Sequence, residues 1–275
     1  MAHPNNSCYR IFYHESKLKI WGIEEAYYVN IYLIEGDDKA LVIDTGRGIG
    51  NLHEFIRTLT DKPVIVVNTH KHFDHTGGNG TFEEVYMLDE EIESSQPEYR
   101  VSESKIKKVI CERLYWNDKR PYNFSPDYMT VWPGVPIIPI RDGFVFELGN
   151  RPIEVIHTNG HTKGSVCLLD RMSRILFVGD TANAGVLIIK GSGQSISKHK
   201  ESMVNLLGRS GEYDLLFLGH GVDSEGINQI EEIIAAEQDI LDGTAVSRPN
   251  DTSWPCSLLY TKGRITVGYD IESVT

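Results

Sequence analysis

The chain has 275 residues, of which 40% are hydrophobic and 24% charged, and this is enough for one large domain with a buried core. Acidic residues (39) outnumber lysine and arginine (27), and the net charge of −12 argues against binding to long nucleic acids, whose phosphates it would repel. The sequence shows neither a signal-peptide pattern nor the ~18 apolar residues of a membrane helix, so we expect a cytoplasmic protein that does not bind membranes.

Four cysteines are scattered along the chain without a CxxC pair, at Cys8, Cys111, Cys167 and Cys256. This spacing argues against a disulfide framework and fits reduced thiols in the cytoplasm. We expect the cysteines to act as small buried hydrophobic residues.

Apolar runs in the first half predict strands that alternate with helices. Residues 27–34 and 40–44 predict two strands joined by a Gly-Asp-Asp turn, and residues 48–59 predict a helix with one apolar face. The run Val-Ile-Val-Val at 64–67 is typical of a fully buried strand, and residues 84–88 predict another.

Residues 97–140 differ from the rest of the chain, because they hold six of the eleven prolines and seven aromatic residues. We predict a helix at 102–114 within an aromatic-rich insertion, and long insertions of this kind often act as lids or binding loops. The aromatic side chains either line a substrate pocket or pack the insertion onto the body, and the sequence does not favour one over the other.

The second half repeats the pattern of strands and helices. Strands are predicted at 144–148, 153–157, 166–170, 174–179 and 214–218, helices at 197–208 and 224–241, and a C-terminal hairpin at 256–269 that turns at Lys262-Gly263. We find no linker between two independent domains, so we expect one domain over 1–275, built as a layered α/β sandwich.

Residues 70–75 read His-Lys-His-Phe-Asp-His and follow the buried strand directly. His70 and His72 are two residues apart and can share one cation, while Asp74 and His75 can reach a second cation nearby. Imidazole and carboxylate ligands suit zinc, iron or manganese. The glycines at 77, 78 and 80 predict a loop here, in which the side chains can converge.

Three later residues have the same surroundings, each close to the end of an apolar strand and next to glycine. They are His161 in Gly-His-Thr-Lys-Gly-Ser, Asp180 in Gly-Asp-Thr and His220 in Gly-His-Gly. Ligands of α/β proteins gather at the carboxyl ends of strands, and glycine beside each side chain lets the backbone approach a crowded site. We therefore expect these residues to join the 70–75 cluster.

The motifs HxHxDH at 70–75, GHTxGS at 160–165, GDT at 179–181 and GH at 219–220 resemble, in this order, those of the metallo-β-lactamase-fold superfamily. The resemblance covers roughly residues 25–240. It implies a four-layer αββα sandwich, with the aromatic-rich segment as an insertion.

The resemblance also implies two metal sites. His70, His72 and His161 would hold the first ion, Asp74, His75 and His220 would hold the second, and Asp180 would bridge both. Asp44 matches the acid of the family that orients a ligand imidazole.

The residues at two positions distinguish this chain from two branches of the family. Residue 180 is aspartate where the main zinc β-lactamases carry cysteine, and residue 72 is histidine where flavodiiron-type oxygen reductases carry glutamate. The chain is instead similar to glyoxalase II and lactonases.

We therefore expect a dinuclear zinc hydrolase that cleaves an ester, thioester or lactone of a small-molecule substrate, with iron or manganese as alternative metals and no organic cofactor. Two divalent ions lower the pKa of a bridging water, whose hydroxide would attack the carbonyl, with Asp74 as the catalytic proton acceptor. The sequence is compatible with a homodimer but does not determine the oligomeric state.

Two other enzyme functions stay open on the same residues. One is a mononuclear-iron dioxygenase acting on persulfides, which metal analysis and oxygen consumption would separate from a hydrolase. The other is a small-molecule phosphodiesterase. A binding module without activity is disfavoured, because all seven ligand positions are filled.

The other histidines are expected to have structural or surface positions. His157 lies on a predicted strand, where a hydrogen-bonded structural role is expected. His3, His14, His53 and His199 have no ligand pattern around them, and we expect them at the surface.

Overall fold

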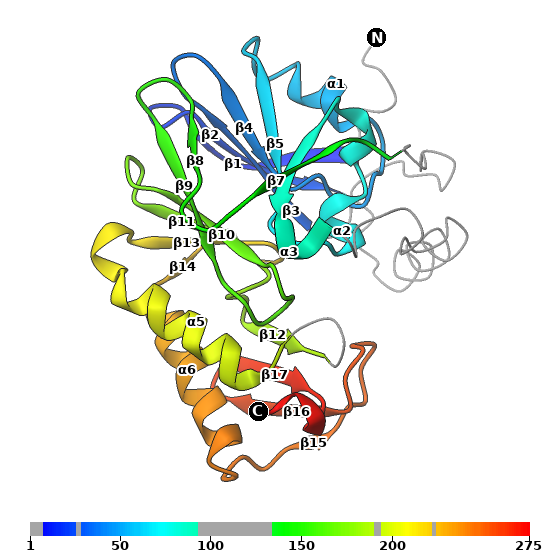
Figure 1. The fold of residues 1–275 in the computed structure, drawn as a ribbon, viewed down its shortest axis with the longest axis vertical. Coiled ribbons are helices and arrows are strands. Elements are labelled where there is room, and N and C mark those ends of the chain that lie inside the picture. The colour runs from blue at the N-terminus through cyan, green and yellow to red at the C-terminus, as the bar shows by residue number, and fades with distance from the viewer. Residues whose placement is uncertain (1–7, 26–28, 93–133, 190–193, 222–223) are drawn as a thin grey trace. The chain divides into compact units, whose positions relative to one another are not determined.

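A computed structural model describes residues 8–25, 29–92, 134–189, 194–221 and 224–275 (Figure 1). The predicted helix at 102–114, Cys111 and the aromatic part of the predicted insertion lie outside these residues. Backbone contacts divide the described chain into two compact units. The first draws on Met1–Met87, Ile92–Ile140 and Phe146–Arg151, and the second on Leu88–Glu91, Arg141–Val145 and Pro152–Thr275. The single domain over 1–275 stays a prediction.

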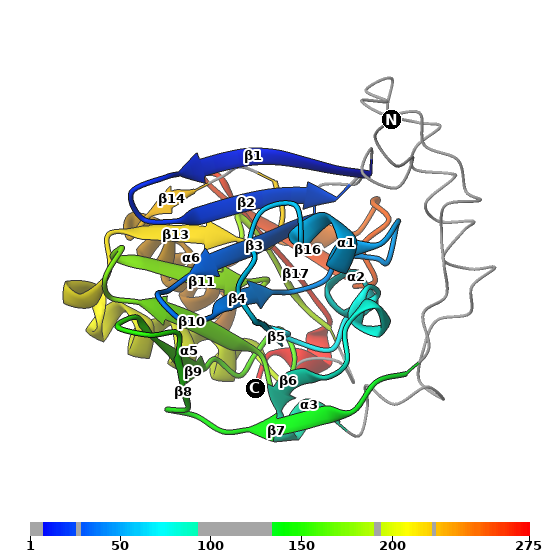
Figure 2. The same ribbon diagram turned by 90° about the horizontal axis from the view of Figure 1, so that it is seen from above.

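The first unit is built on a sheet whose seven strands, among the described residues, follow each other in chain order (Figure 2). They are β1 (Tyr9–Glu15), β2 (Ile20–Glu25), β3 (Val29–Glu35), β4 (Ala40–Ile43), β5 (Val64–Val67), β6 (Val85–Leu88) and β7 (Ile137–Ile140). Strands β1 to β4 pair antiparallel, whereas β4–β5 and β5–β6 pair parallel. The four strands predicted in this half are confirmed as β3 to β6.

Three strands of this sheet were not predicted. Strands β1 and β2 mix buried and exposed side chains irregularly, so their sequences lack a clear period of two. Strand β7 lies within the segment predicted as an insertion. It contains one proline, Pro139, which is tolerated because β7 is the edge strand of the sheet, where an N–H can be missing from the ladder.

A short helix packs against the core of the first unit. Helix α1 (Leu52–Ile56) buries Leu52, Phe55 and Ile56 against residues of the sheet such as Leu33 and Val42. Asn51 caps it by accepting a hydrogen bond from the backbone N–H of Glu54, at 3.1 Å. The predicted helix at 48–59 is too long, because the helix ends at Ile56 and the following residues form turns, while Leu59 still packs against the core.

Two further sheets are formed mainly by residues of the second unit. One, in the order β14-β13-β11-β10-β9-β8, consists of β8 (Val145–Glu147), β9 (Pro152–His157), β10 (Val166–Asp170), β11 (Ile175–Gly179), β13 (Leu215–Leu218) and β14 (Glu225–Gly226). The other, in the order β12-β17-β16-β15, consists of β12 (Gly185–Ile188), β15 (Arg248–Pro249), β16 (Leu258–Lys262) and β17 (Ile265–Tyr269).

The five strands and the hairpin predicted for this half are confirmed. The turn of the hairpin comes one residue later than predicted, at Gly263-Arg264, because Gly263 takes the positive φ of 58° that the turn requires. Strand β12 was not predicted; it is held by parallel pairing with β17, some eighty positions along the chain. The short strands β14 and β15 were also missed.

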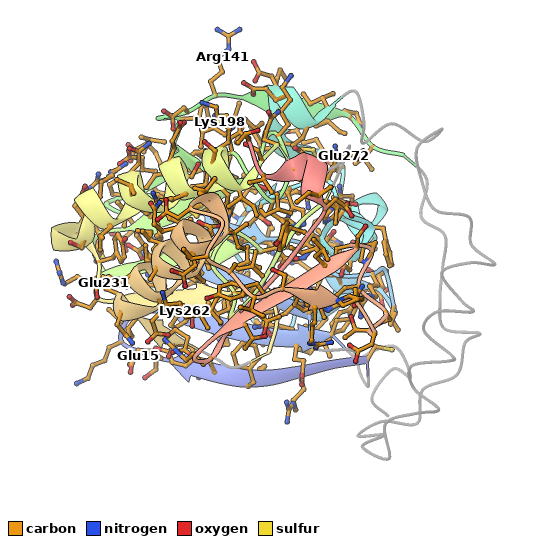
Figure 3. All side chains as sticks on the ribbon, turned by 90° about the horizontal axis from the view of Figure 1, so that it is seen from below. Glu15, Arg141, Lys198, Glu231, Lys262 and Glu272 are labelled. Atoms are coloured by element: carbon orange, nitrogen blue, oxygen red, sulfur yellow. The ribbon has the colours of Figure 1, made fainter. Side chains whose placement is uncertain are left out.

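Two long helices, α5 (Ile196–Gly208) and α6 (Asn228–Leu241), lie side by side in the second unit (Figure 1). Ser195 caps α5 by accepting a hydrogen bond from the N–H of Lys198, and apolar side chains at a helical spacing bury one face of each helix. Charged side chains such as Lys198 and Glu231 occupy the exposed faces (Figure 3). Among the described residues, no helix has the length and apolar character that a membrane span requires.

The cysteines of the described residues are free thiols. Cys8 and Cys167 are buried, as expected, and Cys256 is half-buried. Burial raises the pKa of the Cys167 thiol to about 12, so this side chain acts as a small hydrophobic residue. Short helical elements of the described residues also include α2 (Phe73–Thr76), α3 (Asp89–Ile92) and the 3₁₀ turns at Asn79–Thr81, Ser210–Glu212 and Ile271–Ser273.

Candidate metal centre

The 70–75 motif lies in the first unit, directly after β5. The predicted loop is only partly a loop, because α2 (Phe73–Thr76) and a 3₁₀ turn (Asn79–Thr81) form within it. Helix α2 starts where the N–H groups of His75 and Thr76 bond to the carbonyl of His72. His72 thus precedes the helix, while Asp74 and His75 project from its single turn.

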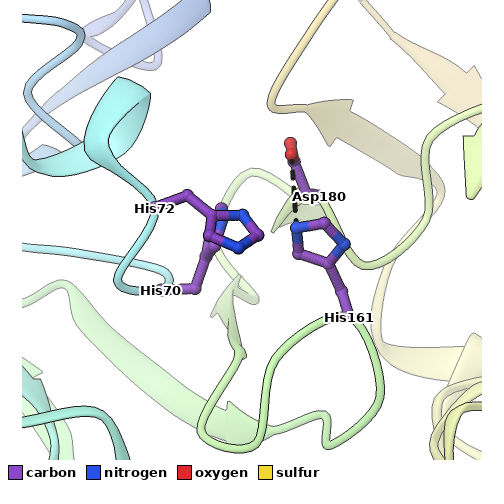
Figure 4. Close-up of side chains that lie close together, drawn as sticks. All are labelled: His70, His72, His161 and Asp180. Carbon is purple, nitrogen blue, oxygen red and sulfur yellow. Dashed lines mark hydrogen bonds and ion pairs between the residues drawn. The ribbon is translucent and has the colours of Figure 1, made fainter. Parts of the chain in front are cut away.

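His70 and His72 place two imidazole nitrogens next to each other. Nε2 of His70 is 3.1 Å from Nδ1 of His72, and His70 is 1% exposed (Figure 4). Two nitrogen ligands of one tetrahedral zinc, each ~2.0–2.1 Å from the metal, lie roughly 3.3 Å apart. The spacing of these two atoms therefore suits two ligands of one cation, as predicted.

Asp44 makes the contact that the resemblance implied. Its Oδ2 accepts hydrogen bonds from Nδ1 of His75 and from the hydroxyl of Thr69, both at 2.8 Å, and its Oδ1 accepts from the N–H of Thr69 at 2.7 Å. The residue is 1% exposed and has a φ of 62°, which is uncommon outside glycine. With Nδ1 of His75 engaged, Nε2 is the nitrogen that can bind a metal.

Asp74 contacts a residue that the sequence analysis did not single out. Nη2 of Arg47 donates to Oδ2 of Asp74 at 3.1 Å, and the Arg47 side chain is 5% exposed. The guanidinium also lies over the ring of Phe73, at 5.9 Å from its centroid. Arg47 thus fixes the orientation of the Asp74 carboxylate.

The three later predicted ligands lie together in the second unit. Asp180 follows β11 and His220 follows β13, and these neighbouring strands pair in parallel, so their carboxyl ends coincide. Oδ2 of Asp180 is 3.6 Å from Nε2 of His161 (Figure 4). Oδ1 of Asp180 is 3.2 Å from Nε2 of His220. One carboxylate therefore presents a different oxygen to each of two imidazoles.

Hydrogen bonds set the orientation of His161 and Asp180. Nδ1 of His161 donates to the carbonyl of Leu187 at 2.8 Å, which leaves Nε2 as the nitrogen that faces Asp180. The side-chain amide of Asn183 donates to Oδ1 of Asp180 at 3.0 Å. Leu187 lies on β12, so the unpredicted strand supplies the acceptor for a predicted ligand.

The chemistry of these groups fits divalent metal ions. His70, His75 and His161 are at most 3% exposed, and imidazole nitrogens held in such a buried setting are common ligands of divalent cations. Both His75 and His161 engage Nδ1 in a hydrogen bond and leave Nε2 for another partner. Each unit thus brings together the predicted ligands that it contains, and their assignment to metal ions stays a prediction.

The histidines outside the motifs mostly follow the sequence analysis. Nε2 of His157 donates to the carbonyl of Lys163 at 2.9 Å, which is the expected structural role. His14 and His53 are exposed, and His3 lies outside the described residues. The surface prediction for His199 is wrong, because this residue is 0% exposed.

Comparison with known proteins shows the family of this chain. The model of the metallo-beta-lactamase superfamily matches residues 25–226, which is more than half of the chain. This chain belongs to that superfamily. The predicted αββα fold class of the metallo-β-lactamase type is thereby confirmed.

Individual relatives of the superfamily indicate the kind of reaction. The acyl-coenzyme A thioesterase MBLAC2 of Gallus gallus is 33% identical over 183 residues, which cover 62% of this chain and 65% of that protein. A hydroxyacylglutathione hydrolase of Maricaulis maris is 32% identical over 114 residues, or 42% of this chain and 32% of that protein. The chain therefore matches less than two thirds of the length of these curated relatives.

Solved structures agree on the fold of the superfamily. A metallo-beta-lactamase from Pontibacter korlensis superposes with a TM-score of 0.56 at 16% identity and covers 82% of this chain and 97% of that chain. At this level of identity the likeness concerns the fold and leaves the substrate open.

Proposed function

We propose that the protein hydrolyses the thioester bond of a small acyl thioester and uses two divalent metal ions, with zinc as the expected metal. The acyl-coenzyme A thioesterase and the hydroxyacylglutathione hydrolase both act, by their names, on an acyl group carried by a thiol compound. A thioester is one of the three substrate classes that the sequence predicts. The proposed metal ligands are His70, His72, Asp74, His75, His161, Asp180 and His220.

The observation that carries this proposal is the geometry of Asp180. Its two oxygens face two different histidines, His161 and His220, at 3.6 Å and 3.2 Å. A carboxylate that bridges two cations offers one oxygen to each, whereas a mononuclear site needs only one of them. This arrangement favours a two-metal hydrolase over a mononuclear-iron oxygenase.

Bound divalent ions would lower the pKa of a water and polarise the acyl carbonyl. The chain itself supplies the orientation of the groups around them. Asp44 and the carbonyl of Leu187 hold His75 and His161 by their Nδ1 atoms. Arg47 holds Oδ2 of Asp74, which we propose as the acceptor of the proton released from the attacking water.

The proposal is tested by metal content and by hydrolysis of an acyl-coenzyme A panel, with the released thiol measured by a colorimetric reagent. We expect about two metal ions per chain, loss of activity in chelator and recovery on addition of zinc. Asp180→Asn removes the charge of the proposed bridge, and kcat/KM should fall by more than about 100-fold, since even changes behind the ligands cost 10–100-fold.

Asp214→Asn is the matched control. Asp214 lies in the same unit, where it is exposed and pairs with Arg174, so the same chemical change should leave kcat/KM close to that of the wild type. One iron per chain together with oxygen consumption on a persulfide would contradict the proposal. Turnover of bis(p-nitrophenyl) phosphate far above that of any thioester would instead favour the phosphodiesterase.

A further inference from the structure

His199 and Glu237 form a fully buried pair behind the Asp180 and His161 loops. His199 lies on α5 and Glu237 on α6, both are 0% exposed, and Nδ1 of His199 is 2.5 Å from Oε1 of Glu237. The two residues come from facing helices, and neither belongs to a motif of the sequence analysis.

His199 contacts the backbone beside two of the proposed ligands. Its Nε2 donates to the carbonyl of Thr181, next to Asp180, at 2.8 Å. Its ring also packs against Gly160, next to His161, so closely that a Cβ at this glycine would lie 2.4 Å from Cδ2 of His199. One side chain therefore touches the main chain of both ligand loops.

Helix α5 holds the second of these loops at one more point. The hydroxyl of Ser202 donates to the carbonyl of Asn159 at 2.8 Å. Ser202 follows His199 by three residues and therefore lies on the same face of the helix. The backbone from Asn159 to Gly160 is thus fastened to α5 immediately before His161.

The pair holds its geometry at an energetic cost. Burial by itself would lower the pKa of His199, but the charge of Glu237 and the hydrogen bonds to Glu237 and Thr181 outweigh it and raise this pKa above its usual value. Oε2 of Glu237 is buried and has no hydrogen-bond partner among the described residues. A buried ion pair with an unsatisfied oxygen is a poor source of stability, because well-packed apolar side chains often serve as well or better.

We propose that His199 and Glu237 are positioning residues that hold the loops of Asp180 and His161 in the geometry required for metal binding. The inference rests on the proposed metal centre. Nε2 of His199 must carry a hydrogen to donate to the Thr181 carbonyl. The contact of Glu237 with Nδ1 favours this protonation state and fixes the ring orientation of His199. In this role the pair acts through the backbone and touches no substrate.

The test measures zinc affinity by competition with a chromophoric chelator, starting from metal-free protein. His199→Leu removes both hydrogen bonds, and we expect the dissociation constant for zinc to rise by about 10-fold to 100-fold. His199→Gln can keep an N–H near the Thr181 carbonyl and should lose less affinity. Glu237→Gln keeps a hydrogen-bonding partner for His199 without the charge, and we expect an intermediate loss.

Tyr213→Phe is the matched control for a structural effect. Tyr213 is buried in the same unit and donates its hydroxyl to the carbonyl of Leu206 on α5, at 2.7 Å, without contact to either ligand loop. Its removal should lower the free energy of unfolding while the zinc affinity stays close to that of the wild type. The cobalt-substituted proteins give a second readout, because a displaced Asp180 or His161 changes the d–d absorption spectrum.

Two results would overturn the inference by itself: equal zinc affinity and cobalt spectra in the wild type and all three pair variants, or an equal loss of affinity in Tyr213→Phe. A wild-type chain that binds no metal would overturn the proposed function and this inference with it, so the two failures are distinguishable. If His199→Leu does not fold, the two glutamine variants decide the question.

Discussion

At the scale of single residues, Glu25 is an ionisable side chain in the buried interior of the first unit. The residue is 0% exposed, and its two oxygens accept hydrogen bonds from the N–H groups of Arg47 and Ile49, at 2.6 Å and 2.8 Å. It thereby anchors the loop that follows Asp44. Burial raises the pKa of Glu25 to about 7 from its usual 4.5, although the two N–H groups and the charge of Arg47 oppose the shift.

This pKa predicts how stability depends on pH. Between pH 4.5 and about 7 the folded chain keeps a proton on Glu25 that the unfolded chain releases, so the free energy of unfolding falls as the pH rises through this window. The full loss would be about 3 kcal/mol, from about 1.4 kcal/mol per pKa unit. Urea denaturation at pH 5 and pH 8, in chelator, measures it.

Glu25→Gln should be less dependent on pH than the wild type over this range, because the titrating group is gone. Exposed Glu54→Gln is the control and should keep the pH dependence of the wild type, since its charge stays in water in both states. An unchanged pH dependence in Glu25→Gln would show that Glu25 does not titrate in this window.

At the scale of elements, the loop after β4 and the segment of α2 touch through their backbones. The N–H of Gly77 donates to the carbonyl of Gly46 at 2.8 Å, and the N–H of Thr45 donates to the carbonyl of His75 at 2.9 Å. A Cβ on Gly77 would lie only 2.3 Å from the carbonyl carbon of Arg47. Gly77 is thus required for the close approach of the two backbones, since its φ of −61° is one that any residue can adopt.

We expect Gly77→Ala to lower the free energy of unfolding by about 1–3 kcal/mol, because overpacked sites have to shift their backbone. The shift would also move Asp74 and His75 and should reduce zinc binding. Gly208→Ala is the control: this glycine ends α5 with open space around its Cβ position, and alanine there should be neutral or stabilising by up to about 1 kcal/mol. Urea denaturation of both variants tests this prediction. Equal stability of Gly77→Ala and the wild type would contradict it.

At the scale of the whole molecule, the proposed ligands come from both compact units. His70, His72, Asp74 and His75 belong to the first unit, and His161, Asp180 and His220 belong to the second. Ions that bind only the folded state stabilise it by mass action, by about 2.7 kcal/mol at a free concentration of 100 times Kd.

Chelation should therefore lower the melting temperature of the whole chain, and added zinc should restore it. Differential scanning calorimetry measures the shift of the melting temperature. We expect a smaller shift in His70→Ala and the wild-type shift in the exposed control His53→Ala. A melting temperature that chelator and zinc leave unchanged would show that metal binding contributes nothing to the folded state.

Elements that depend on local sequence patterns were predicted, whereas elements that depend on contacts between distant residues were missed or given wrong bounds. Strands with continuous apolar runs, such as the half-buried β5 and the fully buried β10, were predicted because the pattern is local. Strand β12 was missed, because its place depends on pairing with β17 far along the chain. Helix α1 was predicted too long, since the apolar spacing that extends to Leu59 continues into the turns after the helix.

The family, the fold class and the seven candidate ligands could be inferred from sequence alone, because each ligand belongs to a short motif whose glycines and preceding strand are local. The contacts of Arg47 with Asp74 and of His199 with Glu237 and Thr181 needed the tertiary structure. These partners are separated by 18 to 38 positions, and no local pattern marks a lone arginine or histidine for burial. Only the folded chain decides which charged side chains lose contact with water, and therefore which of them can support a metal centre.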